Sequence, residues 1–596
     1  MVQNANLIWT NFHTGLAFFV GSAYNNKYII HIAWMKHAGE GTDLPKESNS
    51  QVSGSGWDRM QTRLWRVPIG RRRCTEVIPY LSGKRTEAVK KRRCVFVLLY
   101  LACLRRHDGD RLFLSSFFFL FVVILWDRER ERERVMSLDT LNAIDSFIWG
   151  PPLLILLIGT GIMLTVRLRL LQVFRLPRAL KLIFTAKNQG EGDIDSFKAL
   201  CTALAATVGT GNIVGVATAV HAGGPGAIFW MWMAAFVGMA TKYAEGCLAV
   251  RYRTIDKNGE VAGGPMYYIE NGLGKKYKPL AVLFAFFGVL VAFFGIGTFA
   301  QVNSIVEITR LTADVPVEYT AVVLTIVVAA VTIGGLQSIA RAASKIVPAM
   351  AVIYVISTVA FLAIFYEQIP AAIYEIIHDA FTPTAAAGGF LGATVLVAMR
   401  NGVARGVFSN ESGLGSAPIV AAAAKTKWPA EQGLISMTGT FIDTIIICTL
   451  TGLVLVVSGA WMGDVNGAAL TNAAFLQAFP TYGSLILCVG LTLFAFTTIL
   501  GWNYYGERCM EYLVGVKGIM PYRIVFIILV ACGAFLKLDV IWILADIVNG
   551  LMAIPNLIAL IGLSGVVVAE TKAYFAHVKA EEMAAEEAEK ETVSGD

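Results

Sequence analysis

The sequence has no arrangement of cysteine or histidine residues typical of a disulfide framework or a metal centre. Its nine Cys residues lack paired spacing, and several of them (Cys201, Cys448 and Cys532) lie inside apolar runs. Its seven His residues are equally dispersed. The sequence also lacks the His–Glu motif of metalloproteases and the G-x-S-x-G turn of serine hydrolases. We therefore expect no enzyme, no resident cofactor and no structural metal.

Charged residues are scarce, and this scarcity excludes a soluble globular protein. Asp, Glu, Lys and Arg make up 16% of the 596 residues, and hydrophobic residues make up 56%. Many apolar runs reach the roughly 20 residues needed to cross the hydrocarbon of a bilayer. Because hydrocarbon offers no partners to backbone N–H and C=O groups, such runs predict helices. The sequence indicates an all-α protein with several spans in the plasma (cell inner) membrane.

Residues 1–135 differ in composition from the rest of the chain. They hold 22 Lys and Arg against 12 Asp and Glu, whereas the remainder holds 28 against 31, so the basic excess belongs to this first segment. It gives no reason to expect nucleic-acid binding by the main body. Residues 127–134 alternate Arg with acidic residues, as a translated purine dinucleotide repeat would. We interpret Met136 as the true start, with 1–135 disordered or an error of the gene model; the alternative is a basic extension with a short hydrophobic anchor at 112–126.

From Met136 onward the sequence predicts eleven membrane spans. Their approximate bounds are 147–166, 197–221, 225–249, 280–302, 318–335, 346–366, 388–424, 432–458, 482–506, 521–537 and 540–569. Lys and Arg accumulate on the cytoplasmic side of membranes. If the first span enters from outside, the segments after spans 1, 3, 5, 7 and 9 and the C-terminal tail carry 23 Lys and Arg, whereas the other connections carry two. This alternation predicts a cytoplasmic C-terminus.

The second span carries an interruption at Gly209-Thr210-Gly211-Asn212. Two glycines within three residues each disfavour a helix by about 1 kcal/mol relative to alanine. Within a bilayer, an unwound segment is tolerated only where its backbone groups line a buried or watery cavity. Many secondary transporters build their substrate and ion sites from such breaks. The alternative is a patch of small residues that packs two helices closely.

The seventh span has a similar interruption at 405–416. Its Asn-Glu-Ser-Gly at 410–413 has the spacing of the Asn-Ile-Val-Gly at 212–215 in the second span. Each of these two spans opens a set of five, so the two sets have opposite topology, which is the inverted repeat of secondary transporters. The predicted parts are an extra first helix with an amphipathic connector (136–195), a core (196–570) with repeats at 197–366 and 388–569, and a charged tail (571–596).

Three motifs carry a resemblance to a known family. They are GTGNIVGVATAVHAGGPGAIFW at 209–230, GGPMYYIE at 263–270 and FSNESGLGSAP at 408–418. With these motifs the sequence resembles the alanine or glycine:cation symporter family, in the amino acid-polyamine-cation superfamily with the leucine-transporter fold. The resemblance covers nearly all of 136–575 and none of 1–135. It implies uptake of alanine or a similar small neutral amino acid (glycine, serine) driven by Na⁺, with no obligate protein partner.

The two breaks offer groups that suit the two ends of a zwitterion. N–H groups at the start of a half-helix suit a carboxylate; here they belong to Thr210, Gly211 and Asn212. From the seventh span, carbonyls around Val407 to Asn410, including Ser409, would face the amino group, and Phe408 would cap the pocket. The resemblance adds Gln301 and Trp502 as pocket residues, although Trp502 also suits an interfacial anchor.

A cation site is expected just before the first break. Carbonyls from Ala205 to Val208 lose their helical partners there and suit a hard cation such as Na⁺. The resemblance implies one Na⁺ at this point, completed by the hydroxyls of Thr497 and Thr498. The alternative is that these hydroxyls only satisfy backbone carbonyls, as Thr residues in membrane spans often do. The side-chain oxygen of Asn212 is a candidate ligand for a second ion or for the substrate ammonium, and the sequence does not decide between the two.

Ionisable groups within membrane spans are costly and often functional. We expect Glu411 to hold the N–H groups of the loop at the second break. Asp443 and Asp546 would be proton carriers in the main alternative function, a proton-coupled amino-acid carrier. Arg400 and Arg405 either pair with such acids or extend toward a cytoplasmic vestibule. An ion channel is a further alternative, although the chain has one copy of each break rather than a ring-forming filter motif.

Overall fold

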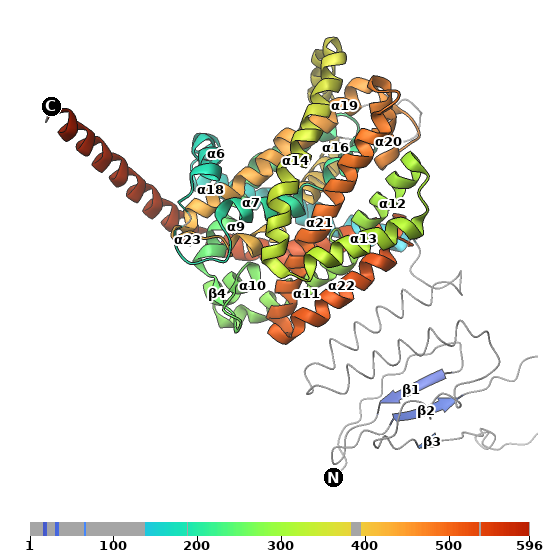
Figure 1. The fold of residues 1–596 in the computed structure, drawn as a ribbon, viewed down its shortest axis with the longest axis horizontal. Helices are drawn as coiled ribbons and strands as arrows, with labels where there is room; N and C mark the ends of the chain where they lie inside the picture. Colours follow the sequence, from blue (N-terminus) through green and yellow to red (C-terminus); the bar gives the residue numbers. More distant parts are fainter. Residues whose placement is uncertain are drawn as a thin grey trace, which may run out of the picture. The chain divides into compact units, whose positions relative to one another are not determined.

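The computed structural model describes residues 16–20, 30–34, 65–66, 138–187, 189–382, 395–535 and 538–594 (Figure 1). The chain divides into two compact units, Met1–Val135 and Met136–Asp596. The described part of the first unit is an antiparallel sheet in the order β1-β2-β3, formed by β1 (Leu16–Val20), β2 (Ile30–Trp34) and β3 (Trp65–Arg66). The sequence did not predict this sheet. The apolar run at 112–126, the alternating segment at 127–134 and Met136 lie outside the described residues.

The described part of the second unit is helical, apart from one hairpin of β4 (Thr254–Ile255) and β5 (Val261–Ala262). The helices of its first half are α3 (Leu138–Ile148), α4 (Pro151–Arg167), α5 (Leu171–Phe174), α6 (Leu176–Thr185), α7 (Ser196–Thr207), α8 (Val214–Gly223), α9 (Gly226–Arg251), α10 (Pro265–Tyr268), α11 (Lys278–Phe294), α12 (Phe299–Ala313), α13 (Val317–Thr332), α14 (Gly335–Ile364) and α15 (Ile369–Asp379). Those of its second half are α16 (Val395–Asn410), α17 (Ala417–Ala421), α18 (Pro429–Thr440), α19 (Thr449–Ser458), α20 (Gly467–Ala478), α21 (Gly483–Val514), α22 (Ile519–Gly533) and α23 (Leu538–Ser594).

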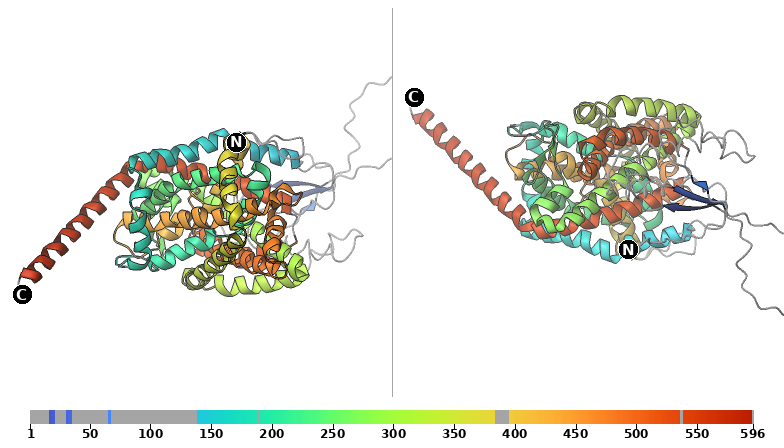
Figure 2. Two further views of the ribbon diagram at one scale, coloured as in Figure 1. Left: turned by 90° about the horizontal axis from the view of Figure 1, so that it is seen from above. Right: turned by 90° about the horizontal axis from the view of Figure 1, so that it is seen from below.

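Seven helices in the described part of the chain are long and apolar enough to cross a membrane, and the bent pair of α7 and α8 makes an eighth. The second unit is therefore a multi-pass membrane protein. The three other predicted spans fall on α9, on α13 and on α16 with α17, and they stay predictions. Beyond the predicted spans, the structure has helices α15 and α20 and a long α23 whose last turns project away from the other helices of this unit (Figures 1 and 2).

The first predicted break is present: α7 and α8 differ in direction by 60° across a single 3₁₀ turn at Thr210–Asn212. At its other end, α7 begins where the Asp195 carboxylate accepts the N–H of Lys198 at 2.8 Å, a standard N-cap. The second break lies between α16 and α17. There Glu411, Gly413 and Gly415 have φ values of 56°, 86° and 82°, which end the helix.

The span predicted near 280–302 lies within one apolar stretch, Lys275–Ala313, that is long enough to cross a membrane, but its helix is interrupted. Helix α11 ends at Phe294, and α12 begins only at Phe299. A Cβ on Gly297 would lie 2.8 Å from the Cβ of Trp502, so a glycine is required where this turn meets α21. The Gly-x-Gly at 295–297 repeats the signal of the first break, and the sequence analysis overlooked it.

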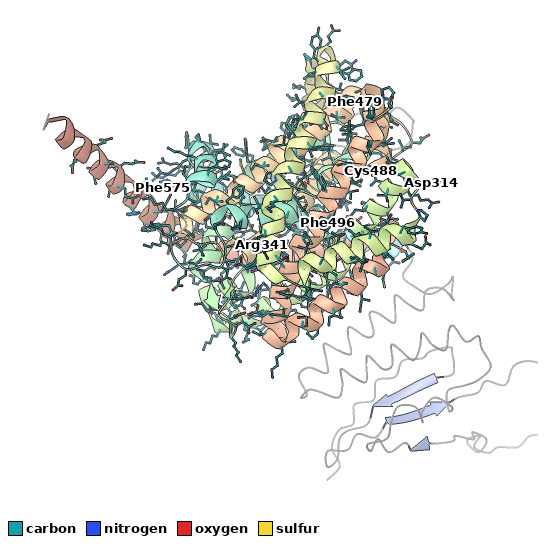
Figure 3. All side chains as sticks on the ribbon, in the orientation of Figure 1. Asp314, Arg341, Phe479, Cys488, Phe496 and Phe575 are labelled. Carbon is teal, nitrogen blue, oxygen red and sulfur yellow. The ribbon has the colours of Figure 1, made fainter. Side chains whose placement is uncertain are left out.

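Two helix ends lie on the same side of the second unit: Asp314 and Phe479, which end α12 and α20, lie on the side away from β4 and α10 (Figures 1 and 3). Phe575 lies on the projecting part of α23 (Figure 3). The predicted alternation of the connections between two sides of a membrane stays a prediction.

Candidate functional site

The first break redirects two backbone N–H groups to side chains. The Gly209 N–H donates to Asn212 Oδ1 at 2.9 Å, and the Thr210 N–H donates to Gln301 Oε1 at 3.3 Å. In an unbroken helix these two N–H groups would reach the carbonyls of Ala205 and Ala206. The end of α7 thus presents carbonyl oxygens that lack their helical donors, which is the condition for a cation ligand there.

Helix α21 places a hydroxyl directly against this break. Thr498 Oγ1 is only 2.3 Å from where a Cβ on Gly209 would stand. The hydroxyls of Thr497 and Thr498 both donate to the Phe494 carbonyl at 3.0 Å, which leaves their oxygen lone pairs for another partner. Thr497 Oγ1 also lies 3.4 Å from the Met350 sulfur on α14. Val208 is the residue that ends α7, and its N–H still bonds the Leu204 carbonyl at 2.7 Å.

The two breaks are in contact with each other. A Cβ on Gly211 would stand 3.0 Å from the Cα of Ser409 and 3.4 Å from the ring of Phe408. Thr210, Gly211, Asn212, Phe408 and Ser409 are all buried. The hydroxyl of Thr210 is also buried and has no hydrogen-bond partner among the described residues. The structure therefore brings together the substrate residues expected from both broken spans.

Asp443 connects both breaks, which the sequence did not reveal. It lies on a π-helical segment, Phe441–Cys448, and is fully buried. Its carboxylate accepts the Asn212 Nδ2 donor at 2.6 Å and the Ser409 hydroxyl at 3.0 Å. Thr444 supplies a further donor at 2.7 Å. The Asn212 oxygen, expected to face an ion or the substrate, instead accepts the Gly209 N–H in this structure.

Glu411 does not bind the N–H groups of its own loop, so that expectation is wrong. Its carboxylate accepts Trp502 Nε1 at 2.8 Å and the Ser416 hydroxyl at 2.7 Å. The left-handed backbone of Glu411 turns its side chain into the core, where α21 supplies the better donor. Trp502 is 1% exposed, which excludes its alternative role as an interfacial anchor. Gln301 accepts a hydrogen bond from the Thr210 N–H at the first break.

An ion pair lies one turn before Phe408 on α16. Arg405 donates to both oxygens of Asp546 on α23, at 2.9 and 2.7 Å, and its guanidinium lies 5.6 Å from the centre of the Phe408 ring. Arg400 approaches Asp145 at 4.0 Å. The structure thus resolves the open choice for Arg405: it pairs with an acid, and that acid is Asp546.

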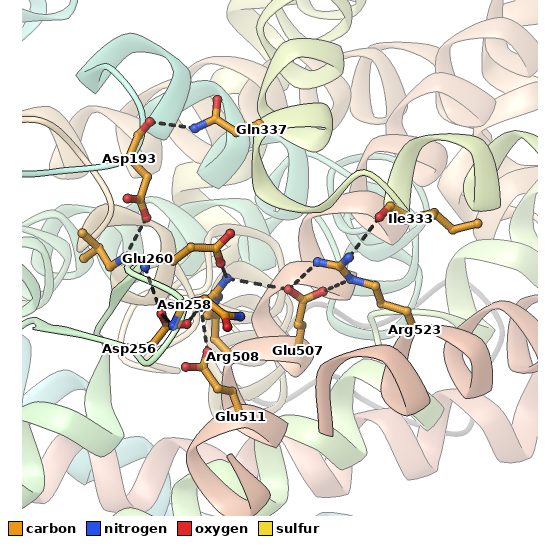
Figure 4. Close-up of polar contacts among 11 residues, drawn as sticks. Asp193, Asp256, Asn258, Glu260, Ile333, Gln337, Glu507, Arg508, Glu511 and Arg523 are labelled. Carbon is orange, nitrogen blue, oxygen red and sulfur yellow. Dashed lines mark hydrogen bonds and ion pairs between the residues drawn. The ribbon is translucent and has the colours of Figure 1, made fainter. Parts of the chain in front are cut away.

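A second ionic cluster joins connections from several helices, and the sequence analysis did not find it. Arg508 on α21 pairs with Asp256 at 3.3 Å, with Glu511 at 2.7 Å and with Glu260 of the β4–β5 hairpin (Figure 4). Glu507 binds Arg523 of α22 at 2.6 Å. The cluster ties the hairpin that follows α9 to the end of α21.

Asp193 extends this cluster to the segment that precedes α7. Its carboxylate accepts the Val261 N–H at 2.8 Å, and its carbonyl accepts Gln337 Nε2 at 2.8 Å (Figure 4). Burial raises the pKa of the Asp193 carboxyl above its ordinary value, while the Val261 hydrogen bond acts in the opposite direction. Next to it, the Ile194 N–H binds the Ala423 carbonyl at 3.1 Å, just after α17. Both broken helices are therefore anchored at this face.

Replacing Gly211 with alanine is expected to reduce transport strongly, because the new methyl group would push the two breaks apart. Its Cβ would stand 3.0 Å from the backbone of Ser409, which cannot rotate away. Gly565→Ala is the matched control, since nothing lies within 4 Å of a Cβ there. Substrate uptake at equal protein levels measures both; equal uptake by the two variants would contradict the close approach.

Comparisons with known proteins agree with this geometry. The sequence profile of the sodium:alanine symporter family matches residues 134–588. A transporter of Haemophilus influenzae is 62% identical over 441 residues, which cover 74% of this chain and 96% of that protein. The sodium/alanine symporter AgcS of Methanococcus maripaludis is 54% identical over 442 residues, covering 73% of this chain and 96% of AgcS.

A further relative is named for a different amino acid. The probable sodium/glutamine symporter GlnT of Bacillus subtilis is 39% identical over 443 residues, which cover 73% of this chain and 90% of GlnT. All three alignments span nearly the whole length of the relatives. With two broken helices in contact and matches of this extent, the chain is a cation-coupled amino-acid transporter that belongs to the sodium:alanine symporter family.

Proposed function

We propose that the protein carries alanine, or a similar small neutral amino acid such as glycine or serine, together with Na⁺ into the cell. The observation that supports this proposal is the meeting of the two breaks beside Thr498, because the residues expected to bind the cation and the zwitterion are all buried there. The amino-acid carboxylate would take the N–H groups of Thr210, Gly211 and Asn212. The Thr210 bond to Gln301 is long, at 3.3 Å, so a charged acceptor can replace it at little expense.

The coupling ion has a separate set of ligands at the same break. Na⁺ would bind the carbonyls of Ala205 and Val208 and the hydroxyls of Thr497 and Thr498, with Asn212 available to a second ion. Oxygen ligands of this kind suit a hard monovalent cation. Thr498→Ala removes one ligand without touching the substrate groups, so it is expected to abolish sodium-driven uptake. Normal uptake by this variant would remove the proposed ion site.

The second break would supply the ligands of the substrate's amino group and would limit the size of its side chain. Carbonyls near Ser409 would receive the ammonium, and Phe408 and Trp502 would bound a pocket too small for long side chains. The glycine-lined backbone of Gly211 allows close approach of a small ligand only. This arrangement favours alanine over glutamine, the amino acid for which the relative GlnT is named.

Alternating access would proceed by rocking of the two inverted five-span sets around this region. In the predicted orientation, the Arg405–Asp546 pair lies on the outer side of Phe408, and the Arg508 cluster lies at the cytoplasmic side. Both ion pairs are intact in the structure. We propose that each of these ion pairs helps to close one side of the transporter, with the C-terminus in the cytoplasm and the spans in the plasma membrane.

Uptake of labelled alanine into vesicles, with Na⁺ and H⁺ gradients imposed separately, tests the proposal. Saturable uptake that follows the Na⁺ gradient is the expected result. Uptake that follows the H⁺ gradient alone would establish the proton-coupled alternative, for which buried Asp443 is the candidate carrier. A current that needs neither substrate nor gradient coupling would instead establish a channel.

A further inference from the structure

One buried ammonium between the broken helices has no part in the function proposed above. Lys242 lies on α9 and is 2% exposed. Its Nζ has no hydrogen-bond partner among the described residues. A buried lysine is almost always paired, because removing its charge from water is costly. The position of this charge therefore needs a physical reason.

Lys242 lines a cavity of about 10 Å³ between the two broken helices. Thr207 at the end of α7, residues 417 and 421 of α17, and Gln432 of α18 form its other walls. Gln432 is also buried, and its Oε1 has no hydrogen-bond partner among the described residues. A volume of about 10 Å³ suits a single water molecule. The cavity thus fits one water that accepts from Lys242 and donates to Gln432.

Three buried acidic residues interact electrostatically with the ammonium of Lys242. They are Glu245, one turn further along α9, Glu411 at the second break and Asp443 on the π-helical segment. The remaining walls of the cavity, from α7, α17 and α18, contribute no ionisable side chain. Glu245 is itself held by Asn556 Nδ2 at 2.7 Å and by the Gly413 N–H at 3.1 Å. One positive charge therefore interacts with three carboxyl groups that lie at or next to the two breaks.

The cavity is close to the proposed cation site. Thr207 precedes Val208, the proposed carbonyl ligand, and lies 3.5 Å from Glu411 Oε2 through its hydroxyl. A cation at the end of α7 and the ammonium of Lys242 would interact with the same carboxyl groups. Two positive charges that lie close together in a buried region repel each other strongly. Each would therefore weaken the binding of the other.

We propose that Lys242 sets the affinity of the transporter for its coupling cation. This inference rests on the function proposed above. The ammonium stabilises the charged carboxylates of Glu411 and Asp443 when no cation is bound. Sodium therefore binds less tightly and can be released. The water in the cavity keeps Lys242 beside Gln432 and away from a direct ion pair with Glu411. Lys242 thus acts on the cation through its electric charge and does not contact the substrate.

The half-saturating Na⁺ concentration for alanine uptake into proteoliposomes tests this role. Lys242→Met keeps the length of the side chain and removes its charge, so the half-saturating Na⁺ concentration is expected to fall by about tenfold. Lys242→Arg keeps the charge and is expected to stay within about twofold of the wild type. The half-saturating alanine concentration at saturating Na⁺ should be the same in all three proteins, whereas general damage to the fold would raise it.

A second variant keeps the test decisive if Lys242→Met does not fold. Gln432→Glu places a carboxylate across the cavity, cancels the field of Lys242 and is expected to lower the half-saturating Na⁺ concentration as well. An unchanged or higher value in the variants that fold would overturn the role of Lys242. Alanine uptake by the wild type that needs no Na⁺ would instead overturn the proposed function.

Discussion

Alanine uptake driven by a Na⁺ gradient is expected to fall by about 100-fold when Asn212 is replaced by alanine, because two buried groups lose their partners at once. The Gly209 N–H loses the acceptor that holds the break open, 2.9 Å away. Asp443 loses its shortest donor, at 2.6 Å. Each unsatisfied buried group costs about 1–3 kcal/mol. The two broken spans would no longer be fixed in the arrangement that both substrate and cation require.

Asn401→Ala is the matched control for this prediction. Asn401 also lies on a broken span, yet among the described residues its amide donates only to the Val397 carbonyl of its own helix, at 3.0 Å. Its loss is expected to change uptake by less than about threefold. Uptake is measured with both variants at equal levels in the membrane. Wild-type uptake by Asn212→Ala would show that the hydrogen bonds between the breaks are dispensable.

The helices and breaks of this protein follow from local features of the sequence. Glycines around Thr210 lower helix stability within the segment itself, so the sequence alone reveals the first break. The polar run from Arg405 to Ser416 reveals the second break but not where it begins, because α16 stays helical as far as Asn410. The motifs at these breaks also identified the family. The same local rule, applied to Gly295 and Gly297, would have predicted the third interruption.

The partners of the buried charges could not be predicted, because they depend on contacts between distant parts of the chain. Arg405 and Asp546 are 141 residues apart, and Trp502 and Glu411 are 91 apart. A sequence shows that such groups lie within membrane spans but not which face of a helix meets which neighbour. Lys242 illustrates this limit, since its surroundings come from four helices that are remote from one another in the chain.

Replacing Arg508 with methionine is expected to destabilise the folded protein by about 3–5 kcal/mol, the usual result of removing one partner from a buried ion pair. The Arg508 side chain is 1% exposed, and its partners Asp256 and Glu511 are each 4% exposed. Without the guanidinium, these carboxylates repel each other with little water to screen them. The β4–β5 hairpin would then separate from the end of α21, and the face closed by this cluster would open.

Two measurements on the purified full chain check this expectation. Thermal unfolding in detergent should show a clearly lower midpoint for Arg508→Met than for Arg178→Met, whose ion pair with Glu582 is 32% and 62% exposed and is worth at most about 1 kcal/mol. Maleimide labelling of Cys509, which is buried beside Arg508, should become faster only in Arg508→Met, as peptide mapping would show. If the contacts of this buried guanidinium hold the hairpin against α21, removing it must change both measurements. Equal midpoints and equal labelling in the two variants would therefore mean that the cluster does not hold this face closed.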